Sequence, residues 1–333
     1  MDKKRTLEMI ADISNAKGVS GFEDEAVNVI RAHSQDCGEQ KEDSLRNFYI
    51  YRKGNNGKQP IVQLDAHSDE VGFMVQSIRP NGTMHIIQIG GWITSNIPAH
   101  LVWIRNAEGK YIRGIVTSKP PHFMSETERK APLEMNNITV DVGATSRREA
   151  IEKFKIRVGE PIVPDAAFEY DEKKDIMIGK SFDCRLGCAA IISTLQELES
   201  CNLNVDVVGA ISTGCPADDT CVEEYAVQTA IKKGPMLRHI DAKMITNPRF
   251  QRYALDMAEK LQIPVQDAVR LSGSTNGAAI HLSEHGIPTI VIGIPVRYAH
   301  THYGISSYED YTNGVRLACE ILKCLNKETI ANF

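Results

Sequence analysis

Three short segments of the sequence carry side chains that can bind a metal ion at the ends of expected strands. The first is His67-Ser68-Asp69-Glu70, which follows an apolar run at 60–66. Because side chains alternate along an extended chain, His67 and Asp69 point to the same side. An imidazole at a strand end can bind zinc, and a carboxylate two residues later can orient its ring. The alternative is a polar strand end with a solvated histidine.

The other two segments contain Asp183 and a pair of histidines. Asp183 lies directly before an expected helix, where the ordinary role of an aspartate is to cap the helix N-terminus. His300 and His302 follow an expected strand at 289–294. Ligands bind beyond the carboxyl ends of strands in open α/β sheets, so these two histidines could bind a metal ion. Solvation of both side chains in a loop is the alternative.

The elements that must position these residues follow an α/β pattern. Helical spacing of apolar residues predicts helices at 3–16, 22–33, 188–198, 248–261 and 307–326, and apolar runs predict strands at 60–66, 205–211 and 289–294. Alternation of strands and helices favours a mixed, mostly parallel sheet with helices on both faces.

The pattern changes between residues 72 and 164. Short β-like runs alternate there with turn signals such as Pro80-Asn81-Gly82 and Gly90-Gly91, and helical periodicity is scarce outside 147–154. This stretch predicts a small β-rich domain at 73–164. It is inserted into a discontinuous α/β domain formed by 1–72 and 165–333.

Composition excludes several classes of function. The 333-residue chain has 42% hydrophobic and 24% charged residues and a formal net charge of −5, as in ordinary soluble proteins. It has no long basic run, which argues against nucleic acid as a partner. It also has no apolar run of about eighteen residues, which argues against a membrane span. The basic residues 3–5 precede an amphipathic, partly acidic segment rather than a signal peptide, so we expect a cytoplasmic protein. Eight cysteines without a Cys-x-x-Cys pair predict reduced, mostly buried thiols.

Three motifs, taken in order, resemble the tetrahedral and glutamyl aminopeptidases, a family formerly also labelled cellulase M. They are Ala-His-Ser-Asp-Glu-Val-Gly at 66–72, Gly-Lys-Ser-Phe-Asp-Cys-Arg-Leu-Gly at 179–187 and Pro-Val-Arg-Tyr-Ala-His-Thr at 295–301. Supporting matches lie at 233–235, 272–278 and 285–289. The resemblance extends over nearly the whole chain, and the combination is more specific than any single motif.

The resemblance implies a metallopeptidase α/β domain with an inserted β-barrel-like domain. It implies two divalent ions per subunit, zinc first, with cobalt or manganese as alternatives. His67 would bind one ion, His300 the other, Asp183 would bridge them, and Asp69 would orient His67. The expected reaction removes amino-terminal residues from short peptides with a water that bridges the two metals. His302 matches no ligand.

The resemblance also implies self-association. Members form dimers and twelve-subunit tetrahedral shells, so the inserted domain at 73–164 is expected to serve dimerisation or assembly. The expected partners are a peptide substrate and further copies of the chain, with no nucleic acid and no membrane. A cis peptide bond between Asp183 and Cys184 is implied as well.

The sequence departs from the family pattern at two places. Cys184 stands where members often have a second acid. After the strand at 205–211 the family has a Glu-Glu pair, in which one Glu is the general base and the other a metal ligand. A helix and a strand ending in another acidic ligand follow. Here Thr213 is followed directly by Gly214.

Three explanations of the second departure are open: the natural protein carries the segment and this sequence omits it, the protein lacks it, or other residues rebuild the site. Glu223-Glu224 and Asp218-Asp219 are better explained as a solvated face and a turn than as replacements. Without the segment, the alternative function is a non-catalytic scaffold or peptide binder. An endo-1,4-β-glucanase is a further alternative, but its mechanism needs two carboxylates and gives the histidines no role.

Overall fold

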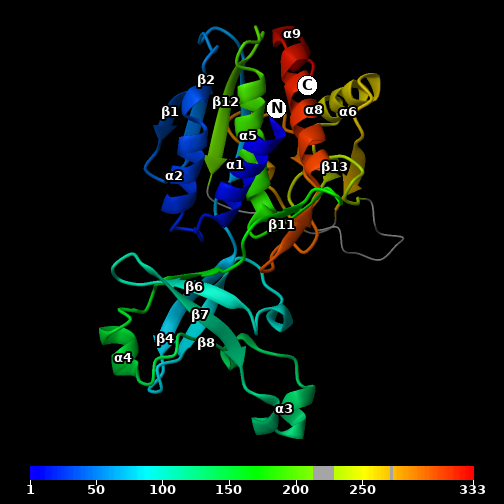
Figure 1. The fold of residues 1–333 in the computed structure, drawn as a ribbon. Coiled ribbons are helices and arrows are strands. Elements are labelled where there is room, and N and C mark those ends of the chain that lie inside the picture. Colours follow the sequence, from blue (N-terminus) through cyan, green and yellow to red (C-terminus); the bar gives the residue numbers. More distant parts are fainter. Residues whose placement is uncertain (213–228, 271–272) are drawn as a thin grey trace.

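The computed structural model describes residues 1–212, 229–270 and 273–333. It has an α/β part and a β-barrel part, joined at the chain segments around residues 70 and 165 (Figure 1). Each part has its own cluster of buried apolar side chains. Within the described residues, no helix has the length and apolarity needed to cross a membrane.

In the described residues, the α/β part contains three small sheets. The first has the order β1 (Gly38–Glu42), β2 (Phe48–Arg52), β12 (Asp206–Ser212) and β3 (Ile61–His67). In it β12 pairs parallel with β3 and antiparallel with β2. The second has the order β14 (Gln266–Val269), β13 (Met236–Ile240) and β15 (Ile292–Gly293), and the third β10 (Glu169–Asp171), β11 (Ile176–Gly179) and β16 (Gly304–Ser306).

Seven described helices belong to the α/β part (Figure 1). They are α1 (Lys3–Asn15), α2 (Asp24–His33), α5 (Phe182–Glu197), α6 (Pro248–Lys260), α7 (Gly277–Ile280), α8 (Tyr308–Cys324) and α9 (Lys327–Ala331). The starts of α6 and α8 are fixed by the side chains of Asn247 and Ser307, which accept hydrogen bonds from backbone N–H groups of the first turn. Helix α5 packs against β3, α1 and α8, so its first residues lie beside the C-terminal end of β3.

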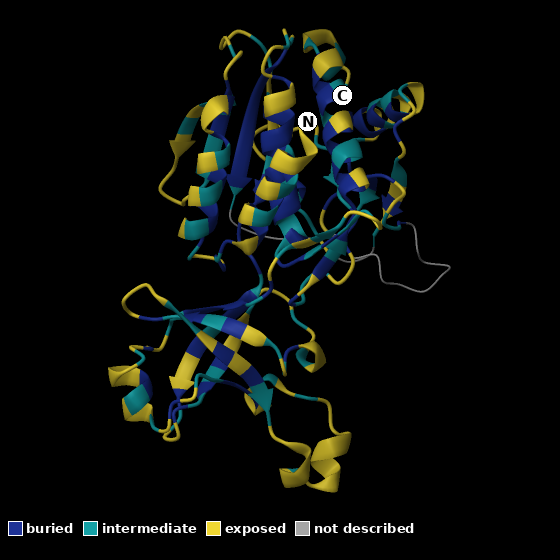
Figure 2. Cartoon of the chain, viewed as in Figure 1, coloured by how far each residue is buried: buried dark blue, intermediate teal, exposed yellow. Residues whose placement is uncertain are grey.

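The strands between residues 72 and 164 close into a barrel. Its order is β4 (Gly72–Ile78), β5 (Met84–Ile89), β8 (Ile138–Asp141), β7 (Tyr111–Ser118), β6 (Leu101–Arg105) and β9 (Pro161–Pro164). Helix α4 (Arg147–Glu152) lies at its rim, and α3 (Glu126–Lys130) projects on an exposed arm (Figure 2). Short 3₁₀ helices lie at Gln35–Cys37, Thr94–Asn96, Pro121–Phe123 and Met135–Asn137. The predicted mixed α/β class with an inserted barrel is confirmed. The described sheets are not mostly parallel, however, because only β12 with β3 and β13 with β14 pair in parallel.

The strand predicted at 289–294 is much shorter than expected, because only Ile292–Gly293 pair with β13. The rest of this segment and the edge strand β3 border one cavity of about 380 Å³. Consecutive residues of both segments, 61–67 and 287–294, line it. Successive side chains of a strand point to opposite faces of the sheet. Because consecutive residues line the cavity, the cavity must lie along the backbone edge of each segment. Within the described residues, no strand pairs with 289–294 on that side.

This arrangement predicts alternating hydrogen exchange along β3. Ser68 N–H donates to Ser212 O, so the amides of Leu64 and Ala66 point to β12, whereas those of Gln63 and Asp65 point toward the cavity. We expect the second pair to exchange about 100-fold faster or more, because opening free energies span from about zero to the global value. Amide exchange followed by NMR measures this. If all four amides were equally protected from hydrogen exchange, the conclusion that one edge of β3 faces a cavity would be wrong.

Candidate metal centre

The three predicted ligands come together from three separate elements. His67 is the last residue of β3, Asp183 lies in the first turn of α5, and His300 lies in the loop after β15. Asp183 Oδ1 is 3.2 Å from His67 Nε2, and Asp183 Oδ2 is 2.9 Å from His300 Nε2. One carboxylate thus directs one oxygen toward each imidazole, which is the arrangement of a bridging ligand between two cations.

Asp183 does not cap helix α5, so the alternative interpretation of this residue as a helix N-cap is wrong. The N-cap position is Ser181, and Asp183 and Cys184 have non-helical backbone angles inside the first turn. The peptide bond between them is cis, as the resemblance implied. The carboxylate of Asp183 is therefore directed to the histidines rather than to the backbone N–H groups of its own helix.

A second carboxylate holds the other side of His67. Its Nδ1 lies 2.9 Å from Asp69 Oδ1, and Ser20 Oγ donates a hydrogen bond of 2.5 Å to Asp69 Oδ2. The chain Ser20–Asp69–His67 fixes the ring, so that Nε2 faces Asp183. Period-2 alternation predicted the His67–Asp69 relation. Ser20 was missed because a lone serine in a distant loop carries no sequence signal.

The charges around His67 favour a cation. Burial alone would lower the pKa of His67, but the contacts with Asp183 and Asp69 raise it well above its usual value. Burial alone would raise the pKa of Asp183, yet the bonds from His300 and His67 hold it below its ordinary value. A positive charge is therefore stabilised between these groups, either as a proton on the imidazole or as a metal ion that replaces it.

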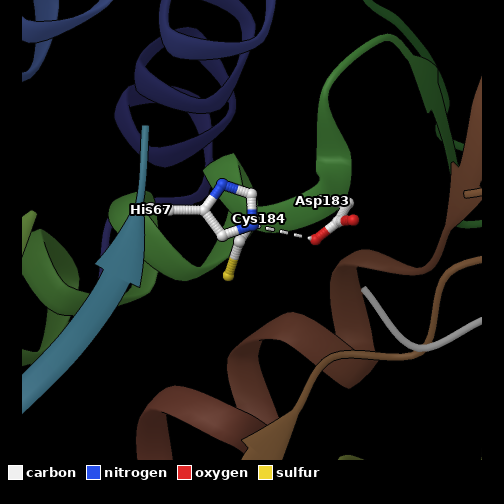
Figure 3. Close-up of side chains that lie close together, drawn as sticks. All are labelled: His67, Asp183 and Cys184. Atoms are coloured by element: carbon white, nitrogen blue, oxygen red, sulfur yellow. Dashed lines mark hydrogen bonds and ion pairs between the residues drawn. The ribbon is translucent and has the colours of Figure 1, made fainter. Parts of the chain in front are cut away.

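Cys184 is the third member of the one group in the described part of the chain that could hold a metal ion (Figure 3). Ligand atoms of His67, Asp183 and Cys184 all lie within 4.8 Å of one another, with His67 buried and the other two partly buried. Every cysteine that the structure describes is a free thiol. Burial raises the pKa of the Cys184 thiol to about 11, so it is neutral unless a metal binds it.

A buried ion network beside the centre was also missed by sequence reasoning. Glu70 accepts hydrogen bonds from Lys180 Nζ at 2.6 and 2.7 Å, from Ser181 Oγ at 2.7 Å and from Gly18 N–H at 3.0 Å. Arg185 Nη2 lies 3.5 Å from the same carboxylate, and Arg185 Nε donates to Ser68 O. These contacts tie the segment on both sides of Asp183 to the strand end that carries His67.

The loop that carries His300 is held in an uncommon backbone conformation. His300 and Tyr298 have positive φ angles of 59° and 61°, which non-glycine residues adopt rarely. A Cβ atom at Gly91 would lie 3.2 Å from His300 Nδ1, so the barrel approaches the centre closely there. His302 points elsewhere and stacks on His100 at a centroid distance of 4.0 Å.

Some predicted features fall outside the described residues. The junction of Thr213 with Gly214, and the acidic pairs Asp218-Asp219 and Glu223-Glu224, lie in the stretch 213–228. The absence of the expected Glu-Glu pair after Thr213 is therefore a statement about the sequence alone.

Known proteins are similar to this chain in both sequence and fold. The profile of the M42 glutamyl aminopeptidase family matches residues 47–214 and 200–317. The chain belongs to this family. The two matched pieces overlap at 200–214, which includes the junction of Thr213 with Gly214.

Individual M42 relatives match nearly end to end. The glutamyl aminopeptidase of Lactococcus lactis subsp. cremoris is 26% identical over 353 aligned positions, covering 98% of each chain. The alignment is longer than the 333 residues of this chain, so it contains positions that this chain lacks. The TET aminopeptidase of the marine sediment archaeon Thaumarchaeota archaeon SCGC AB-539-E09 superposes with a TM-score of 0.95 at 28% identity, covering 100% of this chain and 99% of that one.

A third structure shares the fold at lower identity. The Pyrococcus horikoshii TET1 peptidase, described as able to assemble into a tetrahedron or a large octahedral shell, has a TM-score of 0.85 at 22% identity over 96% of this chain and 100% of that one. Membership of the M42 family makes the protein a peptidase of the aminopeptidase class, in a family that depends on metal. The non-catalytic alternative finds no support among the relatives.

Proposed function

We propose that the protein removes amino-terminal residues from short peptides with divalent metal held at Asp183, between His67 and His300. The observation that carries this proposal is the Asp183 carboxylate, which has one oxygen within 3.2 Å of each imidazole. His67 and His300 would hold one ion each and Asp183 would be shared. Zinc is the first candidate, since imidazole and carboxylate ligands suit it; cobalt and manganese accept the same ligands.

The donor set fits a cation on chemical grounds. His67 has Nδ1 2.9 Å from the buried Asp69 carboxylate and Nε2 3.2 Å from Asp183, which is the usual setting of a metal-bound histidine. Bound there, a divalent metal supplies a Lewis acid for the scissile carbonyl and acidifies a water molecule. Asp69 and Ser20 keep His67 in one orientation, and the Glu70 network keeps the Asp183 segment against β3.

Self-association belongs to the same proposal. The Pyrococcus horikoshii TET1 peptidase is described as able to assemble into a tetrahedron or a large octahedral shell. The barrel at 73–164, with its exposed α3 arm, offers a surface outside the α/β part of this chain. We propose that this inserted domain makes the contacts of a dimer and of a twelve-subunit shell in the cytoplasm. The free thiols are in keeping with a reducing compartment.

Removal of the metal should abolish peptidase activity. Dialysis against a chelator is expected to lower hydrolysis of aminoacyl-nitroanilides by at least about 100-fold, because losing an outer partner of a ligand alone costs about 10–100-fold. Zinc, cobalt or manganese added back singly should restore activity, and the most effective ion identifies the metal. Elemental analysis before and after dialysis gives the ions bound per chain.

Cellulose oligomers serve as the control substrate. Cleavage of these oligomers that is insensitive to chelator would overturn the peptidase proposal in favour of the glucanase. Full nitroanilide hydrolysis after complete metal removal would overturn the metal dependence and leave the peptidase class in place.

A further inference from the structure

The ion expected beside His67 has too few ligands if only histidine and carboxylate are counted. Catalytic zinc sites usually have three protein ligands. His67 and Asp183 supply two, and the acidic ligands that the family resemblance places after residue 213 are missing from the sequence. Figure 3 shows that Cys184 lies directly beside both residues, with its sulfur below the imidazole ring.

We propose that the Cys184 thiolate is the third protein ligand of the ion next to His67, which makes this position a His–Asp–Cys site. This inference rests on the proposed metal-dependent function and goes beyond it by naming a ligand that the M42 pattern does not supply. On binding, the S–H bond breaks, its proton passes to solvent, and the sulfur donates an electron pair to the metal.

Packing around Cys184 leaves room for its sulfur next to the centre. Gly187 lies three residues later on the same helix, and a Cβ atom there would come within 2.7 Å of Cys184 Sγ. The same Cβ would come within 3.0 Å of Ala66 Cβ on β3. Glycine and alanine at these positions therefore let the thiol lie between α5 and the strand end that carries His67.

The neighbouring thiol on the same helix has a different role. Cys188 is fully buried and its sulfur lies 3.0 Å from His67 O, to which it can donate. It therefore contacts the backbone of His67 and is not part of the group formed by the three ligand atoms. Cys188 is the matched control for Cys184, because both lie in α5 and both can be changed to serine.

A thiolate ligand changes which metal the site prefers. Sulfur is a soft donor that favours zinc, cobalt and cadmium over manganese and magnesium, which prefer oxygen. We expect the His67 position to bind zinc much more tightly than manganese. The Cys184→Ser variant should weaken zinc binding by about 100-fold or more, since even the loss of an outer partner costs about 10–100-fold. Its affinity for manganese should change little.

Cobalt titration of the full-length protein tests the proposal without relying on activity. In the wild type, Co²⁺ should give visible d–d bands together with a near-ultraviolet charge-transfer band from sulfur to cobalt. The Cys184→Ser variant should lose the charge-transfer band, and Cys188→Ser should retain it. X-ray absorption of the zinc-loaded wild type should show one sulfur at about 2.3 Å, which needs no variant.

The outcomes separate this inference from the proposed function. Cobalt that binds with d–d bands and no charge-transfer band, or zinc without a sulfur neighbour, would overturn the thiolate ligand and leave the metal-dependent peptidase standing. A charge-transfer band that survives in Cys184→Ser and disappears in Cys188→Ser would show that Cys188, and not Cys184, is the sulfur ligand. A wild type that binds neither ion would overturn both proposals.

Discussion

The Asp183→Asn variant is expected to lose its metal and its peptidase activity together. The amide keeps the shape of the side chain but carries no negative charge, and its nitrogen cannot coordinate a cation as a carboxylate oxygen does. Both imidazoles that face Asp183 would then lose their shared anionic partner. We expect metal affinity to fall by more than about 100-fold, beyond the range for outer partners. Calorimetric zinc titration and nitroanilide hydrolysis measure the two losses.

An exposed aspartate provides the control for this variant. Asp171 on β10 pairs with Lys174 at the surface, and Asp171→Asn removes the same charge away from the centre. Its metal affinity and activity should match the wild type. If Asp183→Asn bound zinc as tightly as Asp171→Asn, the proposed bridging role of Asp183 would be wrong.

The sequence contained enough information to predict the arrangement around His67 and the two parts of the fold. Alternation along β3 puts His67 and Asp69 on one side, and a helix after Asp183 puts that residue near a strand end. The short β-like runs and turn signals between residues 72 and 164 predicted the barrel. These features depend on local periodicity, which a single sequence displays directly.

Long-range relations could not be predicted in the same way. The link from Ser20 to Asp69 joins residues 49 positions apart, and that from Lys180 to Glu70 joins residues 110 positions apart. Neither residue type signals such a partner. The strand predicted at 289–294 is mostly wrong for a related reason: a regular strand needs a partner along its length, and only Ile292–Gly293 pair with β13.

Glu70→Gln is expected to cause a large loss of stability. The Glu70 side chain is 1% exposed and those of Lys180 and Arg185 are 3% and 1% exposed, so the change leaves two buried cations without their anion. Breaking a buried pair by removing one partner costs about 3–5 kcal/mol. Urea unfolding followed by circular dichroism measures the difference. The control is Glu126→Gln, whose exposed pair with Lys130 contributes at most about 1 kcal/mol.

The dependence of this loss on pH tests its electrostatic origin. Burial alone would raise the pKa of Glu70, but the charges of Lys180 and Arg185 lower it below its ordinary value of 4.5. A carboxyl whose pKa is lowered by folding stabilises the protein above its unfolded pKa and loses that contribution as the pH falls through the folded one. The wild type should therefore exceed Glu70→Gln in stability at pH 7, and the difference should shrink as the pH falls below about 4.5. A difference that stays constant from pH 7 to pH 3 would mean that Glu70 acts through packing rather than through charge, and the network would then not be what holds Asp183 against β3.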